Sequence, residues 1–230
     1  KQGQFQIVDI VQLFSPICKM AKQIVNGNTI PSLVREAFRI AEEEKPGPVL
    51  LELPEDIAAE DADTVDLIIP HKRYYAVAGE QVIAEAAGSI NAVTHPLVLI
   101  GAGANRKEAR RAISEFIQLT GIPFFNTQMG KGVVDESSDL FLGTAALSDK
   151  DYLHDYIKNA DLIINIGHDV IEKPPFFMEH GGTKVIHVNY KSAQVDQVYF
   201  PQIEVVGDIA LSVDALGALI GKRLSLDLSD

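Results

Sequence analysis

The stretch VLIGAGANRKEARRA, residues 98–112, joins an apolar run to a helical pattern through a turn that contains Gly101 and Gly103. The run before the turn is apolar throughout, which is typical of a strand buried on both faces of a parallel sheet. After the turn, Ala109, Ala112 and Phe116 recur at helical spacing, so we predict an amphipathic helix over residues 105–120. A buried strand, a glycine turn and a helix in this order are typical of a doubly wound fold.

The same alternation of apolar runs and helical patterns continues on both sides of this stretch. We predict strands over residues 97–101, 123–126, 162–167, 185–188 and 204–206, and helices over residues 80–93, 105–120, 150–159 and 209–220. Continuously apolar strands separated by helices indicate a parallel sheet that helices cover on both faces. The fold class that we predict is therefore α/β, with a doubly wound, Rossmann-like parallel sheet.

The chain before this alternation predicts only part of a further α/β unit. A helix is expected over residues 28–44, with Asn28 or Thr29 as its cap and Pro31 in its first turn. A Pro/Gly break and an apolar strand over residues 49–53 follow. Residues 57–78 are acidic and irregular and are predicted to be a linker, so that a second unit begins near Gly79.

Composition excludes several classes of protein. The 230 residues carry a formal charge of −12, which would repel a nucleic-acid backbone. No apolar run is long enough for a membrane span and the first residues do not resemble a signal peptide, so we expect a cytoplasmic protein. The single Cys18 excludes a disulfide framework, and the six histidines show no metal-ligand spacing, so no protein-bound metal is expected.

The glycine turn matches a dinucleotide site only weakly. The spacing is G-x-G-x-x-R, and Arg106 stands where the third glycine of the fingerprint would allow close packing of helix and strand. About 20 residues further on, where an acidic residue would hold a ribose hydroxyl, the chain offers only Asn126, Thr127 and Gln128. A standard NAD site is therefore disfavoured.

Two charged stretches next to predicted strand ends are interpreted as structural. Lys107, Arg110 and Arg111 lie opposite the apolar stripe of their helix, which indicates a solvated outer face, with an anion site at Arg106 as the alternative. In NIGHDVIEKPPFF, residues 165–177, Gly167 ends a strand, and His168, Asp169 and Glu172 follow at its carboxyl end. Acid–base or metal chemistry of these three side chains is one interpretation. We favour a structural loop, held by hydrogen bonds of Asp169 and by the Pro174-Pro175 pair.

Several longer stretches together resemble a known family. FQIVDIVQLFSPICKMAKQI, IPSLVREAFRIAEEEKPGPVLLELPEDI and PLVLIGAGANRKEARRAISEFIQLTGIPFFNTQMGKGVV occur in the order and spacing of the acetolactate synthase group of thiamine diphosphate (ThDP) enzymes. ADLIINIGHDVIEKPPFF, KVIHVNY and VVGDI continue the resemblance to the end of the chain. Its most specific parts are the run from Lys45 to Asp56 and the L-T-G-I-P entry at residues 119–123.

The resemblance implies a fragment of a three-domain enzyme. Residues 1–70 would be the last part of the pyrimidine-binding domain with a linker, and residues 71–225 the Rossmann-like central domain. The C-terminal domain, which holds the diphosphate and Mg²⁺ in this family, would be absent. The family's activating glutamate would precede Lys1, so the fragment alone is expected to be inactive and to hold no cofactor. The parent enzyme would be a homodimer or homotetramer acting on pyruvate or another 2-keto acid.

Few site residues carry over from the family. Phe5 and Gln6 match two substrate-facing residues of an A-F-Q-E stretch, although their neighbours differ, and Glu55 replaces a lysine of the biosynthetic members. The FAD segments G-x-H-G and G-x-R-F-D-D-R correspond to GTAALSD and GHDVIEK, which lack the histidine and both arginines. We therefore favour a nucleotide fold without a tightly held nucleotide, with FAD or an ADP-bearing ligand as the alternative. The candidate nucleotide-binding residues are Gly101, Gly103, Asn126, Thr127, Gly167, Asp169, Asn189 and Asp208.

The function expected from these observations is that of a fragment of an acetolactate synthase, which converts two pyruvates to 2-acetolactate and CO₂. Other ThDP-dependent chemistry, such as glyoxylate carboligation or oxalyl-CoA decarboxylation, is the nearest alternative. A rival from another class is an autonomous FAD- or NAD-binding module, and a third is an assembly scaffold without a ligand.

Overall fold

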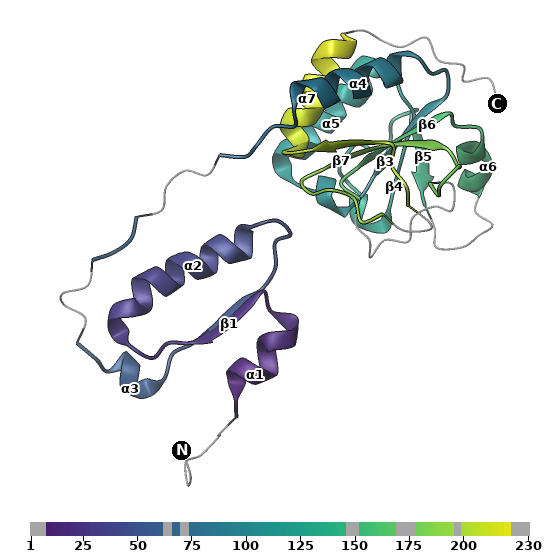
Figure 1. Cartoon of the computed structure of the whole chain (residues 1–230). Helices are drawn as coiled ribbons and strands as arrows, with labels where there is room; N and C mark the ends of the chain where they lie inside the picture. The colour runs from purple at the N-terminus through teal and green to yellow at the C-terminus, as the bar shows by residue number, and fades with distance from the viewer. Residues whose placement is uncertain are drawn as a thin grey trace. The chain divides into compact units, whose positions relative to one another are not determined.

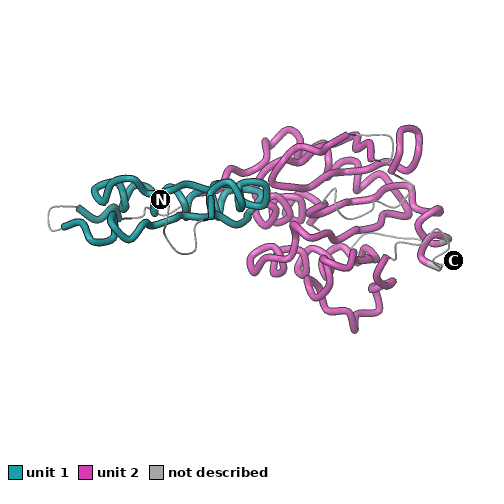
Figure 2. Tube along the Cα trace, turned by 90° about the horizontal axis from the view of Figure 1, so that it is seen from below, with its two compact units in different colours: residues 1–73 teal, residues 74–230 magenta. Residues whose placement is uncertain are grey.

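The computed structural model describes residues 8–61, 66–69, 74–145, 152–168, 178–195 and 199–221. The chain divides into two compact units, residues 1–73 and 74–230, which Figure 2 shows in different colours. Phe5, Gln6 and Asp169 lie outside the described residues.

The first unit is a small β-α-β arrangement (Figure 1). Strands β1 (Met20–Gln23) and β2 (Val49–Glu52) pair in parallel, and helix α2 (Ile30–Glu42) connects them. Short helices α1 (Ile10–Phe14) and α3 (Glu55–Ala58), and 3₁₀ turns η1 (Ser15–Ile17) and η2 (Gly27–Thr29), complete the unit. Helix α2 and strand β2 were predicted within two residues, whereas α1, β1 and α3 were not.

The second unit contains a six-stranded, all-parallel sheet. Its strands lie in the order β5-β4-β3-β6-β7-β8. They are β3 (Pro96–Ile100), β4 (Phe124–Asn126), β5 (Phe141–Thr144), β6 (Leu162–Ile166), β7 (Lys184–Asn189) and β8 (Ile203–Val206). Counted from β3, this is the 3-2-1-4-5-6 order of the Rossmann fold, so the predicted fold class is confirmed.

Helices cover both faces of this sheet. Helices α4 (Glu80–Asn91), α5 (Lys107–Thr120) and α7 (Ile209–Ile220) share one buried apolar cluster with alternate strand residues such as Val98 and Ile164. Helix α6 (Tyr152–Lys158) contributes Leu153 and Ile157 to the cluster on the opposite face. All five residues of β3 and of β6 are buried, because each of these strands has a strand on both sides and a packed layer on both faces.

Candidate functional site

The carboxyl ends of β3 and β6 form the point where the strand order reverses, which is where ligands bind in doubly wound folds. Two short turns follow β3 and β4 at this edge, η3 (Ala102–Ala104) and η4 (Gln128–Gly130). The edge therefore gathers the described candidate residues: Gly101 and Gly103 after β3, Asn126 and Thr127 at β4, Gly167 after β6, Asn189 at β7 and Asp208 after β8.

The glycines at the strand reversal contact one another through their backbones. Gly101 N–H donates to the Ile166 carbonyl at 2.8 Å, and Gly103 N–H donates to the Gly167 carbonyl at 2.8 Å. Gly167 has φ +74°, and a Cβ on it would lie 2.3 Å from the Ala104 nitrogen. The glycine turn therefore lies directly on the end of the neighbouring strand, and two of its amides already have backbone partners.

Arg106, just before α5, reaches toward the end of β7. Its guanidinium carbon lies 4.1 Å from the centre of the Tyr190 ring, a cation–π geometry. Beside it, Asn105 Nδ2 donates to the Met129 carbonyl at 3.2 Å, and Arg110 Nε donates to Asn105 Oδ1 at 3.2 Å. These contacts tie the start of α5 to the turns after β4 and β7.

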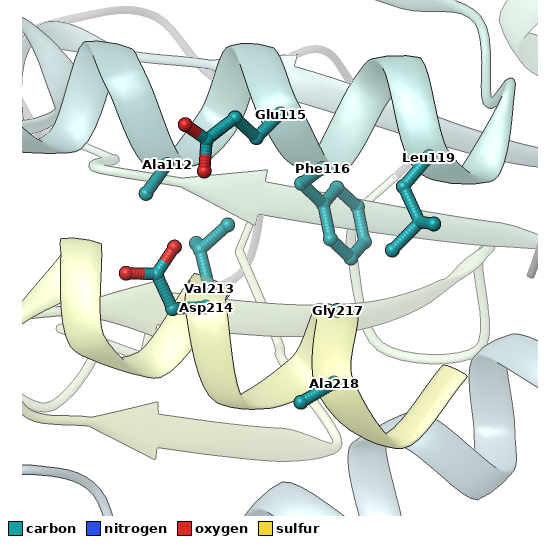
Figure 3. A pocket seen from close by; sticks show the side chains of 8 residues that line it. All are labelled: Ala112, Glu115, Phe116, Leu119, Val213, Asp214, Gly217 and Ala218. Carbon is teal, nitrogen blue, oxygen red and sulfur yellow. The ribbon is translucent and has the colours of Figure 1, made fainter. Parts of the chain in front are cut away.

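Arg111 lies on the outer face of α5, as predicted, and forms an ion pair with a residue of α7. It donates to Glu115 at 2.6 Å and to Asp214 at 2.7 Å, and both of these carboxylates line a groove between α5 and α7. Figure 3 shows this groove, in which Phe116 and Leu119 of α5 point toward Gly217 of α7. The groove is separate from the carboxyl edge of the sheet, because its α5 residues begin only at Ala112.

A carboxylate that the sequence analysis missed, Glu136 in the loop after η4, contacts the end of β4. Asn126 Nδ2 donates to Glu136 Oε1 at 3.0 Å, and Gly132 N–H donates to the same oxygen at 3.0 Å. Lys131 Nζ lies 3.1 Å from Glu136 Oε2. The Gly132 amide, Lys131 and Asn126 together hold the pKa of Glu136 below its ordinary value. Glu136 was missed because the turn η4 folds it back onto a residue ten positions earlier.

Thr127, Asn189 and Asp208 hold turns and helix starts. Thr127 Oγ1 accepts from Gly130 N–H at 3.1 Å, and Asp208 Oδ1 accepts from Leu211 N–H at 3.0 Å as the N-cap of α7. Asn189 Nδ2 donates to the His168 carbonyl at 2.8 Å, and Asn189 Oδ1 accepts from Tyr190 N–H at 2.8 Å. Each of these polar side chains therefore has a partner within the protein.

Residues 83–216, which run from α4 through all six strands into α7, match the family described as "Thiamine pyrophosphate enzyme, central domain". The chain belongs to the thiamine pyrophosphate enzymes. The match covers more than half of the chain and includes the whole sheet of the second unit, so the family resemblance inferred from the motifs is confirmed.

Individual thiamine pyrophosphate enzymes are similar over nearly the whole chain. A catabolic acetolactate synthase of Raoultella terrigena is 29% identical over 96% of the chain, and an acetolactate synthase of Bacillus subtilis is 28% identical over 98%. A glyoxylate carboligase of Escherichia coli O157:H7 is 26% identical over 92%. The aligned regions cover 40%, 41% and 36% of these relatives, so the chain spans about two fifths of their length.

The described residues do not form a site for the family's cofactor. Among them, no group of three or more His, Cys, Asp or Glu side chains could hold a metal ion, which a diphosphate normally requires. The glycine amides that could face a phosphate donate to neighbouring carbonyls instead. We therefore derive no catalytic step through ThDP from these residues. The described helices also include none that is long and apolar enough to cross a membrane.

A second group that the sequence analysis missed lies beneath the opposite face of the sheet. Asn165, His187 and Tyr199 are each at most 2% exposed and hydrogen-bond to one another. Burial lowers the pKa of His187 and raises that of Tyr199. His168, which the sequence analysis considered for acid–base chemistry, stacks on the Tyr199 ring with centroids 4.1 Å apart. The two acidic residues of that motif, Asp169 and Glu172, lie outside the described residues.

Proposed function

We propose that this chain is part of a ThDP-dependent enzyme that joins two pyruvates to 2-acetolactate with release of CO₂. The observation that carries this proposal is the similarity to two acetolactate synthases over at least 96% of the chain. In such an enzyme ThDP and Mg²⁺ supply the carbanion chemistry, and the protein orients the cofactor and excludes water. The two units would contribute the end of the pyrimidine-binding domain, residues 1–70, and the central domain, residues 71–225.

Glyoxylate carboligation is the second candidate, because a glyoxylate carboligase is similar over 92% of the chain. Both reactions use a 2-keto acid, and the described residues contain no substrate site that separates them. Phe5 and Gln6, which the resemblance places toward the substrate, are proposed to face it in the complete enzyme. We also propose a homodimeric or homotetrameric, cytoplasmic parent enzyme.

The function is tested by an assay of the protein with its natural flanking sequence, supplied with ThDP, Mg²⁺ and either pyruvate or glyoxylate. We expect 2-acetolactate from pyruvate, and no product from the 230-residue chain under the same conditions. Activity with glyoxylate alone would favour the carboligase. Turnover of pyruvate by the 230-residue chain itself would contradict the proposal that this part is inactive.

We further propose that the central domain holds no tightly bound nucleotide. The support is that the described candidate residues already bond within the protein: Gly103 to Gly167, Asn126 to Glu136, and Asp208 to the start of α7. FAD, which the resemblance assigns to the biosynthetic members of the family, would have to displace these hydrogen bonds to bind there. No step of the reaction is assigned to it.

We expect purified protein to show no flavin absorbance near 450 nm and no stabilisation by FAD, ADP or NAD. A ligand at 100 times its dissociation constant stabilises a fold by about 2.7 kcal/mol, which for a domain of this size is roughly 5–10 °C in Tm. A shift of that size with one nucleotide in a thermal-shift measurement would contradict the proposal and support a nucleotide-binding module.

A further inference from the structure

Three buried side chains beneath the α6 face of the sheet form a continuous chain of hydrogen bonds. Asn165 on β6 and His187 on β7 are register partners, so both point to the same face. Tyr199, in the connection between β7 and β8, places its hydroxyl 3.4 Å from Asn165 Nδ2 and 2.7 Å from His187 Nδ1. This series of hydrogen bonds ends at the Lys191 carbonyl, which lies 2.9 Å from His187 Nε2.

The direction of these hydrogen bonds follows from the groups themselves. A carbonyl only accepts, so His187 Nε2 carries a hydrogen and donates to Lys191. In a neutral ring Nδ1 is then an acceptor, and the Tyr199 hydroxyl donates to it while accepting from Asn165 Nδ2. The geometry therefore fits neutral His187 with its hydrogen on Nε2, and burial of the ring favours that uncharged form.

This chain attaches the β7–β8 connection to two strands of the sheet. Lys191 and Tyr199 belong to the connection, whereas Asn165 and His187 belong to β6 and β7. A backbone hydrogen bond of 2.6 Å from Phe200 N–H to the Met178 carbonyl lies next to Tyr199. The ring of His168, at the carboxyl edge of the sheet, stacks on the Tyr199 ring. Tyr199 therefore contacts both this edge and the buried hydrogen bonds.

Protonation of His187 would disrupt the arrangement. A hydrogen on Nδ1 would point at the hydroxyl hydrogen of Tyr199, and the charge would lie among apolar side chains of the cluster that includes Leu153 and Ile157 on α6. Two titratable groups besides Tyr199 face the ring. Glu204, its register partner on β8, favours the charged form, and His168 lies 6.5 Å away, centroid to centroid. Burial outweighs both the hydrogen bond to the Lys191 carbonyl and the charge of Glu204, so the pKa of His187 lies below its ordinary value.

We propose that Asn165, Tyr199 and His187 form a pH-sensitive clasp, which holds the β7–β8 connection on the sheet while His187 is neutral and releases it when His187 is protonated. The sign follows from burial of the neutral form. An unfolded histidine titrates near pH 6.5 and the folded one below it, so the clasp is complete above about pH 6.5 and is lost as the pH falls through the folded pKa.

The clasp is tested by amide hydrogen exchange of the connection at pH 7.5 and pH 5.5, corrected for intrinsic exchange chemistry. We expect protection of the residues around Lys191 and Phe200 to fall about tenfold, as one unit of histidine titration allows, while protection of β3 stays constant. His187→Asn does not titrate, and its amide oxygen can replace Nδ1 as an acceptor for the Tyr199 hydroxyl, so the protection of this variant should not depend on pH. His180→Asn, at an exposed histidine whose ring lies 4.8 Å from that of Phe200, is the control for titration of this second histidine and should retain the pH dependence.

A pH dependence that persists in His187→Asn overturns the proposal. Protection that does not change with pH in the unchanged protein also overturns it. That result would mean that the hydrogen bonds reverse their direction on protonation while the connection stays in place. Asn165 Oδ1 is buried without a hydrogen-bond partner among the described residues, and rotation of the amide would offer it to Tyr199. If His187→Asn does not fold, ¹⁵N shifts of the His187 ring in the unchanged protein decide, because a hydrogen on Nδ1 at pH 7.5 contradicts the clasp.

Discussion

Replacement of Gly167 by alanine is expected to lower the free energy of unfolding of the second unit by about 4 kcal/mol or more. Gly167 has φ +74°, a backbone conformation that residues other than glycine rarely adopt. Its Cβ would lie 2.3 Å from the Ala104 nitrogen and 2.7 Å from the Gly103 carbonyl carbon. Both are backbone atoms of the turn after β3, so relief requires β3 and β6 to separate where they pair. Urea denaturation followed by circular dichroism measures the loss.

Gly181→Ala separates the two sources of this cost. Gly181 has a similar φ of +83°, but a Cβ there meets nothing within 4 Å. The backbone conformation alone costs about 1–2 kcal/mol, so the difference between the two variants measures the close approach of the chain at the strand reversal. Equal losses would show that Gly167 does not pack on the glycine turn as described.

This contact gives a glycine-rich turn at a strand reversal a role other than dinucleotide binding. In the fingerprint, glycines allow a pyrophosphate to approach the backbone. Here Gly103 and Gly167 allow one backbone segment to approach another, and the amide of Gly103 donates to a carbonyl of the protein. The same residue type at the same position therefore meets a packing requirement, which a sequence pattern does not distinguish from a phosphate-binding one.

The sequence predicted five of the six strands of the sheet, including the edge strand β8, and missed the edge strand β5. Strands β3 and β6 are central and apolar throughout, so their period and length were plain. Strand β5 was missed because it is an edge strand, only partly buried, and pairs with a register shift beside Gly143, whose φ is +137°. The helix predicted from residue 105 begins at Lys107, because the chain first forms a 3₁₀ turn.

The sequence indicates a residue of the candidate site only where a polar residue stands directly at the end of an apolar strand. Asn126 and Thr127 follow an apolar run directly, whereas Glu136 reaches Asn126 through a turn that the spacing rule does not anticipate. Asn165 and His187 each interrupt an otherwise apolar strand and prove to be register partners, which is a signal that the sequence contains. Tyr199 arrives from a connection, and its place follows only from the three-dimensional fold.

The loop that carries Glu136 is expected to depend on Gly130 nearly as strongly as the strand reversal depends on Gly167. A Cβ on Gly130 would lie 2.1 Å from the Ile100 carbonyl oxygen and 2.8 Å from its carbon. That oxygen already accepts from Thr127 N–H at 2.9 Å, so the carbonyl has little freedom to turn away. We expect Gly130→Ala to lower the free energy of unfolding by about 3 kcal/mol, in the range of overpacked interiors.

The matched control is Gly88→Ala, at an exposed position inside α4 where a Cβ meets nothing within 4 Å. Alanine in a helix interior is favoured over glycine, so this variant should gain about 0.5–1 kcal/mol in the same urea measurement. Because Gly130→Ala must lift the turn off β3, the side-chain amide of Asn126 should lose its bond to Glu136 and exchange with solvent faster. A large loss of stability with slow Asn126 exchange would place the strain elsewhere than beneath this loop.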